Sequence, residues 1–348
     1  MESNEIPQIT PVPGVIKAIK EGCNLAANKA YLLLIPLVLD LFLLFGPKLR
    51  IDQYFNPLFN IAFQQMPATL SNSQRQQLEL AADMAAEAIE SVNLLGFVQT
   101  FPVGVRVLFS ASGNTSPLGT TPEIQILSAI GILLIIFAML GFGVLLGTIY
   151  YSLTAAAARI NGKFSWGSFG KQLLNVIVML VAMIVALFII MVPFACIMTF
   201  IYMLVPFLYR ILIFLAMVIA CWLVVPLFYI PHGIFMENLD FPHAVRRSLD
   251  LGSWSGPITV RYILFSMLIS LGMDMIWTIP AQSSWLILVS IFGHAFVSTA
   301  LLASSFILFR ELSIWQTENR SFLEWRKANL RFRHIIRKQT QKENDTND

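Results

Sequence analysis

Charged residues are scarce in this chain. Only 12% of its 348 residues are Asp, Glu, Lys or Arg, and 57% are hydrophobic. Soluble domains carry about 25% charged residues, so the composition excludes an ordinary soluble protein. Four stretches have no charged residue at all: 124–158, 172–209, 211–236 and 275–309. Because a helix needs about 20 apolar residues to cross a bilayer, these stretches predict an all-α integral membrane protein.

Motifs for metal binding and catalysis are also missing. Cys23, Cys196 and Cys221 lie far apart without a CxxC spacing, which argues against a disulfide framework or a zinc site. The chain has no HExxH, GxSxG or GxxxxGK[ST] pattern. LGMDM at 271–275 lacks the second glycine of the GxGD pattern of intramembrane aspartyl proteases. We therefore predict no metal, no cofactor and no enzymatic activity.

The apolar stretches divide into six predicted spans. A single helix from Lys171 to Arg210 would be about 57 Å long at 1.5 Å per residue, nearly twice the thickness of the bilayer core, so we expect a turn near Pro206. Pro280 marks a second turn, before the last span. The predicted spans are 30–46, 124–151, 173–199, 211–230, 258–279 and 285–309, which together form a transmembrane domain over 30–309.

Basic residues predict the orientation of the spans. Connections 152–172 and 231–257 and the tail 310–348 carry most of the Lys and Arg, whereas connection 47–123 has four basic and six acidic residues. The positive-inside rule then places the N-terminal segment 1–29 and the tail in the cytoplasm. We expect a multi-pass protein of the cell membrane, with 47–123 as an extracytoplasmic helical insertion.

A weak internal repeat runs through this layout. Short amphipathic segments precede the first, third and fifth spans: PGVIKAIKEGCNLAANKA at 13–30, KFSWGSFGKQLLN at 163–175 and FPHAVRRSLDLGSWSG at 241–256. Each segment lies on the predicted cytoplasmic side, before a pair of spans. The sequence thus predicts three hairpins, each preceded by a cytoplasmic amphipathic helix.

The segment at 241–256 has the densest charge. A helix from about Pro242 to Gly252, capped by Asp240, would gather His243, Arg246, Arg247 and Asp250 on one face and Phe241, Ala244, Val245, Ser248 and Leu249 on the other. We interpret it as an interfacial helix whose arginines point at lipid phosphates and whose apolar side meets the acyl boundary. The alternative is a specific phosphate or anionic headgroup site made by His243, Arg246 and Arg247.

The surrounding sequence, VVPLFYIPHGIFMENLDFPHAVRRSLDLGSW at 224–254, carries a family resemblance. An apolar run ends near a proline, and an acidic residue precedes a small amphipathic helix; the matching residues are Pro226, Glu237, Ala244, Val245, Arg246, Arg247, Ser248 and Leu249. This layout, over residues 13–310, resembles bacterial polytopic membrane proteins related to the glycerophosphoryl diester phosphodiesterase membrane-domain family. The resemblance implies a membrane domain only, because the catalytic barrel of the family's name has no room in this chain.

The basic tail is a second candidate for lipid contact. Ser321 and Glu324 form an S-x-x-E capping box that predicts a helix to about Lys338, and its basic residues include Arg326, Lys327 and Arg331. Each basic residue near an anionic surface contributes about 1 kcal/mol, so we expect this helix on the inner leaflet. Binding of RNA or of a protein partner is the alternative.

The insertion contains one further predicted helix. SNSQRQQLELAADMAAEAIESV at 71–92 has a Ser73–Gln76 capping box and a row of acids, Glu79, Asp83, Glu87 and Glu90. We interpret the row as a solvated face; a cation-binding stripe is the alternative.

Three ionisable residues fall inside predicted spans, where such residues are candidates for function. Asp40 lies about 15 Å from the inner end of the first span, and His294 about 14 Å from the outer end of the last. Both are therefore near the bilayer midplane, and we predict that they face each other. Asp274 lies nearer the outer surface and is expected to reach water.

The function predicted from these features is that of a lipid-associated or accessory membrane protein with anionic headgroups as partners. An unidentified protein partner is a further expectation, and nucleic acid is disfavoured. The alternative is a transporter or permease component whose path includes Asp40 and His294. A lipid-modifying membrane enzyme ranks third.

Overall fold

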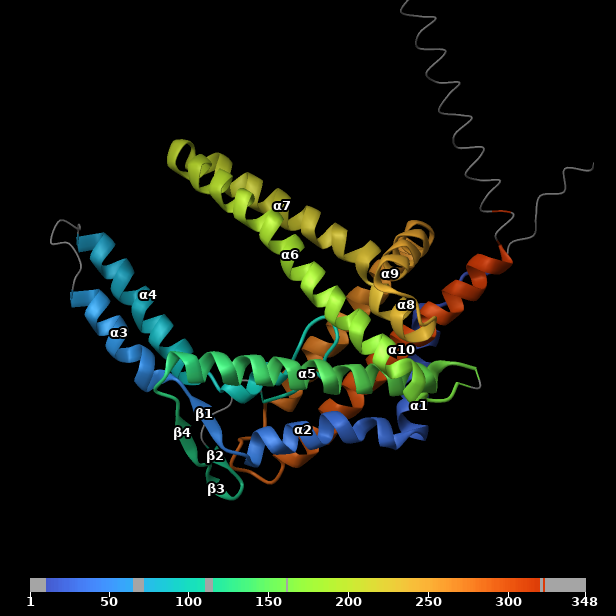
Figure 1. Cartoon of the computed structure of the whole chain (residues 1–348), viewed down its shortest axis with the longest axis horizontal. Coiled ribbons are helices and arrows are strands. Elements are labelled where there is room, and N and C mark those ends of the chain that lie inside the picture. Colours follow the sequence, from blue (N-terminus) through green and yellow to red (C-terminus); the bar gives the residue numbers. More distant parts are fainter. Residues whose placement is uncertain (1–10, 65–71, 110–114, 161, 320–321, 323–348) are drawn as a thin grey trace, which may run out of the picture.

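The computed structural model (Figure 1) describes residues 11–64, 72–109, 115–160, 162–319 and 322. Six helices account for most of the bundle: α2 (Leu34–Phe45), α5 (Ala129–Ala158), α6 (Trp166–Leu204), α7 (Pro206–Leu227), α9 (Phe241–Trp277) and α10 (Ile287–Glu318). Shorter helices are α1 (Val15–Asn28), α3 (Asp52–Gln64), α4 (Asn72–Ser91) and α8 (Ile230–Met236), with 3-10 turns η1 (Ala30–Leu33) and η2 (Leu94–Val98).

The long apolar helices make this a multi-pass membrane protein. Within the described residues, five helices are long and apolar enough to cross a bilayer, and the pair of α1 with η1–α2, bent by 91°, makes a sixth if it counts as one span. The predicted turns are confirmed, because α6 ends at Leu204, α7 begins at Pro206, and α9 and α10 are separated between Trp277 and Ile287.

The predicted separate helices before the third and fifth spans are wrong. Segment 163–175 runs into α6, and segment 241–256 is the first part of the 37-residue α9, which continues through Gly252 and Pro257. Gly252 does not end a helix; a Cβ there would lie 3.1 Å from the Cα of Pro226, so the glycine allows α9 to approach α7 closely. Only the first segment forms a separate helix, α1.

Helix α10 lies at the centre of the bundle and contacts α1, α2, α5, α8 and α9. Its residues Phe306 and Phe309 are buried in the main apolar cluster with Tyr229 and Phe235. At Gly22, α1 crosses α10 without room for a side chain, since a Cβ would lie 2.4 Å from the Ala300 carbonyl oxygen. Close contact through small residues is the usual way that helices associate in membranes.

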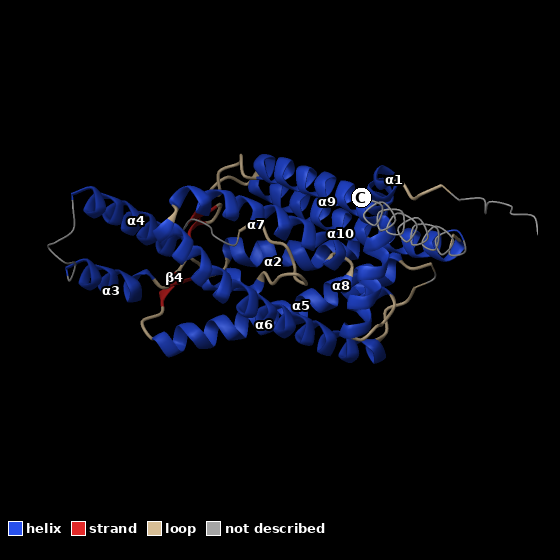
Figure 2. Ribbon diagram, turned by 90° about the horizontal axis from the view of Figure 1, so that it is seen from above, coloured by secondary structure: helices blue, strands red, loops and turns tan. Residues whose placement is uncertain are grey.

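Helices α3 and α4 lie at one end of the molecule, and α1 lies at the other (Figure 2). At the end that we call the basic end, Lys29 Nζ lies 3.3 Å from the Ala157 carbonyl oxygen, and Lys171 forms a 3.1 Å ion pair with Asp240. At the opposite end, which we call the insertion end, α3 and α4 project from the bundle (Figure 1). The connections predicted to share one side of the membrane therefore lie together at one end of the protein.

Short strands pair the beginning of the insertion, next to α2, with its end. β1 (Lys48–Arg50) pairs in parallel with β4 (Glu123–Gln125), and β2 (Thr115–Ser116) forms an antiparallel pair with β3 (Gly119–Thr120). Lys48 Nζ donates to the Leu43 carbonyl oxygen at the end of α2. Helix α4 matches the helix predicted at 71–92, and its acidic residues are exposed.

Lys48 gives the insertion a testable pH dependence. Burial first, and the charge of Arg50 second, lower the pKa of Lys48 from 10.5 to about 8. Between these values the unfolded state binds more protons than the folded state, so stability rises with pH; below about 8 the cost of the buried ammonium is fully present. We expect the melting temperature of the natural chain, relative to Lys48→Met, to rise between about pH 7.5 and about pH 10. A constant difference across that range would contradict the prediction.

The α6–α7 hairpin leaves the rest of the bundle at an angle (Figure 1). Its apolar side chains are exposed, with Phe188 at 67%, Phe214 at 69% and Trp222 at 73%. Exposure on this scale suits a surrounding of lipid, because acyl chains solvate such side chains as well as a protein interior does.

Candidate functional site

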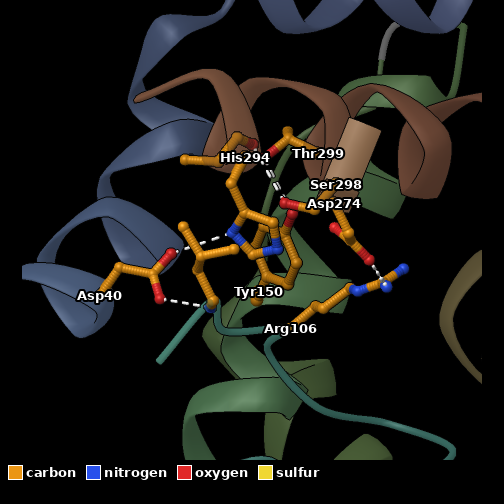
Figure 3. Close-up of polar contacts among 9 residues, drawn as sticks. Asp40, Arg106, Tyr150, Asp274, His294, Ser298 and Thr299 are labelled. Carbon is orange, nitrogen blue, oxygen red and sulfur yellow. Dashed lines mark hydrogen bonds and ion pairs between the residues drawn. The ribbon is translucent and has the colours of Figure 1, made fainter. Parts of the chain in front are cut away.

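Asp40 of α2 and His294 of α10 meet inside the bundle (Figure 3). His294 Nδ1 lies 3.0 Å from Asp40 Oδ2, and the two side chains are 3% and 0% exposed. The prediction that these residues face each other is confirmed. A buried carboxylate needs such partners, since burying a polar group without a hydrogen bond is unfavourable.

The second oxygen of Asp40 has a partner that the sequence did not indicate. The backbone N–H of Leu108 donates to Asp40 Oδ1 at 2.6 Å. The carboxylate therefore joins α2 and α10 to residues 99–109, which we call the inserted segment. This segment belongs to connection 47–123, which was expected to lie outside the membrane.

The inserted segment is neither helix nor strand, with bends at 101–104. Alternate residues are buried, at Val103, Val105, Val107 and Phe109, whereas Arg106 is exposed. One face of the segment therefore packs against the bundle, with the period of two that is typical of an extended chain.

Two glycines of α5 make room for this segment. A Cβ at Gly143 would lie 2.1 Å from the Val98 carbonyl oxygen, and one at Gly147 would lie 2.7 Å from the Cα of Gly104. Gly147 is about 27 Å along α5 from its start at Ala129, at 1.5 Å per residue. The segment thus reaches far into the transmembrane part of the protein.

Few backbone groups of the inserted segment have a hydrogen-bond partner among the described residues. Besides Leu108 N–H, the Pro102 carbonyl oxygen accepts from the Tyr151 hydroxyl at 3.0 Å, and the Val103 carbonyl oxygen accepts from Thr100 Oγ1 at 2.6 Å. Within the described chain, residues 100–109 make no backbone–backbone hydrogen bond. Non-helical backbone at membrane depth is tolerated only where protein buries it or where it lines a watery cavity.

A second contact fastens the segment to α9. Arg106 forms an ion pair with Asp274 and donates to the Ser270 hydroxyl. The Arg106 and Asp274 side chains are 43% and 29% exposed. Asp274 lies three residues before the end of α9 at Trp277. The expectation that Asp274 simply reaches water is therefore incomplete, because it neutralises an arginine from the insertion.

A hydroxyl pair lies beside His294 (Figure 3). The Tyr150 hydroxyl of α5 donates to Thr299 Oγ1 of α10 at 2.8 Å, and both groups are buried. On the other side of the imidazole, His294 Nε2 has no hydrogen-bond partner among the described residues. The site is therefore a packed polar cluster that joins α2, α5, α10 and the inserted segment.

The predicted lipid-facing residues of α9 have different surroundings. Arg247 contacts other parts of the protein: its Nε lies 3.2 Å from Glu237 Oε1, its NH1 lies 2.6 Å from Gln316 Oε1, and its guanidinium is 5.9 Å from the centre of the Phe309 ring. His243 and Arg246 are exposed. Glu237 and Gln316 thus give Arg247 partners from other parts of the chain, which the helical pattern of 241–256 does not indicate.

The predicted apolar side of the same stretch is partly wrong. Ala244 and Ser248 are fully buried against protein and do not reach an acyl boundary. Asp240 does not cap α9 through its side chain; Asn175 Oδ1 instead accepts from Phe241 N–H at 2.8 Å. The hydrogen bond and the charge of Lys171 lower the pKa of Asp240. These contacts attach the start of α9 to α6.

The remaining residues predicted to contact lipid headgroups, Arg326, Lys327 and Arg331, lie outside the described residues. Helix α10 continues to Glu318, so the first residues of the predicted tail belong to it. Within the described part of the chain, no three His, Cys, Asp or Glu side chains are grouped so that they could hold a metal ion.

Comparisons with known proteins found no matching family model, curated protein or solved structure. The resemblance to the membrane-domain family therefore remains a prediction from the residues at 224–254.

Proposed function

We propose that this chain is a non-enzymatic, lipid-associated membrane protein that contacts anionic lipid headgroups at its basic end. The observation that carries the proposal is the exposure of His243 and Arg246 at the start of α9, next to Leu249, whose side chain is 46% exposed. An exposed cation with an exposed apolar side chain three residues further along the helix suits the boundary between phosphates and acyl chains.

The proposal includes an orientation in the cell membrane. Six crossings, with the bent α1–α2 pair as the first, leave both chain ends on the cytoplasmic side. The gathering of Lys29, Arg159, Lys171 and Arg310 at the basic end supports this orientation through the positive-inside rule.

The proposal predicts that Arg246→Gln weakens the retention of anionic lipid about fivefold, since one basic residue near an anionic surface contributes about 1 kcal/mol. Native mass spectrometry of the purified chain would measure the phosphatidylglycerol that stays bound. Arg75→Gln is the matched control, because Arg75 is an exposed residue of α4 at the insertion end. Equal retention in the two variants would refute the headgroup contact.

Transport is a second candidate function, favoured by the inserted segment. The inserted segment, which is neither helix nor strand and bonds to Asp40 through Leu108, resembles the interrupted backbone that lines substrate paths in transporters. If a watery path reaches this depth, Leu108→Cys, in a chain whose three cysteines are replaced by serine, will react with a charged thiol reagent added from the insertion side. A thiol that stays unreactive in the folded protein would leave the segment as a structural plug.

A further inference from the structure

The basic end contains a pocket that is separate from the Asp40 site. It is shallow, with a volume of about 260 Å³, and lies between α1, the C-terminal end of α5 and α10. Its wall combines polar groups, among them Glu21, Asn28 and Arg310, with apolar Leu25 and Ile307. Drug-sized ligands occupy pockets of about 300 Å³ or more, so this one has the size for a headgroup and not for a whole lipid.

One side of the pocket is rich in hydrogen-bond acceptors. Glu21 contributes a carboxylate, and α5 contributes the carbonyl oxygens of Ala157 and Ala158 at its C-terminus. Unpaired carbonyl groups at a helix C-terminus carry about half a negative charge in total. Lys29 and Arg310 each bond to one of these two carbonyls, but a carbonyl oxygen has two lone pairs. This side of the pocket therefore suits an ammonium group.

Arg310 supplies a positive charge next to these acceptors, because it bonds to the Ala158 carbonyl oxygen. Arg310 lies 3.8 Å from Glu21, which is longer than a hydrogen bond, and its side chain is 25% exposed. Lys17 lies 3.6 Å from Glu21 and 3.5 Å from Glu311, again without a hydrogen bond. The acid and the arginine are therefore close enough to neutralise each other but keep free hydrogen-bonding capacity.

We propose that this pocket binds the headgroup of a zwitterionic phospholipid, with the ammonium at Glu21 and the α5 carbonyls and the phosphate at Arg310. An anionic lipid without an amine would bring its charge toward Glu21, and a simple cation would face Arg310. A molecule that carries both charges matches both sides, and Leu25 and Ile307 offer an apolar wall for the start of its chains. This inference rests on the proposed lipid association, but it names another lipid class and another surface.

The test is a binding titration of the full chain in detergent with short-chain phosphatidylethanolamine. Phosphatidylglycerol of equal chain length and inorganic phosphate are the comparison probes. We expect phosphatidylethanolamine to bind at least tenfold more tightly than either probe, and Glu21→Gln and Arg310→Gln each to weaken it at least fivefold. Asn28→Phe, a change at an exposed residue of α1, should also weaken it, because the ring fills the pocket and leaves the charges in place.

Three results would contradict the proposed binding of a zwitterionic headgroup in this pocket. Phosphatidylglycerol that binds as tightly as phosphatidylethanolamine would remove the need for an ammonium, and phosphate that binds as tightly would assign the site to a free anion. Unchanged binding in Glu21→Gln and Asn28→Phe would exclude this pocket. Arg246→Gln separates the two proposals. If this change lowers the retention of anionic lipid while the pocket variants leave phosphatidylethanolamine binding unchanged, the proposed function is supported and the pocket is not. If only the pocket variants weaken lipid binding, the pocket is supported and the headgroup contact on α9 is not.

Discussion

Asp40→Leu should destabilise the folded protein by about 2 to 4 kcal/mol, because it leaves two buried donors, His294 Nδ1 and the Leu108 N–H, without an acceptor. The loss would be measured by reversible unfolding in mixed micelles. Asp83→Leu is the control, since Asp83 is exposed on α4; it should change stability by less than about 0.5 kcal/mol.

A double-mutant cycle tests the pairing itself. Asp40→Asn keeps one acceptor for Leu108 and should cost less than Asp40→Leu. The effects of Asp40→Asn and His294→Ala should then be non-additive by about 0.5 to 1.7 kcal/mol, the range found for hydrogen bonds between membrane helices. Strictly additive losses would mean that the two residues do not depend on each other, despite the 3.0 Å contact.

Gly147→Val should strongly destabilise the folded protein. A Cβ at this position would lie 2.7 Å from the Cα of Gly104 and 3.0 Å from its nitrogen, so the inserted segment must move. Because both contacts are backbone atoms, no side chain can rotate away. We expect the free energy of unfolding to fall by about 3 kcal/mol or more, the upper range for overpacked cores, or folded protein not to accumulate.

The same helix offers the control for this change. A Cβ at Gly141 would meet nothing within 4 Å, and alanine is the better helix former by up to about 1 kcal/mol. Gly141→Ala should therefore leave the melting temperature unchanged or raise it. If Gly147→Val melted like Gly141→Ala, the inserted segment would not be packed against α5.

The helical spans could be predicted because long uncharged stretches have few alternatives in a bilayer. Asp40 and His294 could be paired in advance because each falls near the middle of its predicted span, counted from the inner end of the first span and the outer end of the last. The continuous α6 and α9 could not be foreseen, since Gly252 and Pro257 usually end helices; here Gly252 serves the contact with Pro226. Arg247 pairs with Glu237 and Gln316, which lie 10 and 69 residues away along the chain. Spacings of three and four residues within one helix cannot indicate such partners.

The inserted segment was missed for a different reason. TFPVGVRVLF at 100–109 lies between polar, turn-rich sequences, which predict an outer connection. A signal was present in its alternation, because Val103, Val105, Val107 and Phe109 occupy every second position, as in a half-buried extended chain. What could not be predicted is that its surroundings are helices and not a sheet.

The separation of Asp40 and His294 along the chain, 254 residues, also constrains the order of events during synthesis. When α2 leaves the ribosome, neither α10 nor the inserted segment exists yet, so its carboxylate must enter the membrane without either donor partner. An aspartate at the centre of a helix opposes insertion by about 2.5 to 3.5 kcal/mol, and α2 is short. We therefore expect α2 to be held stably in the membrane only after α10 has been synthesised and inserted.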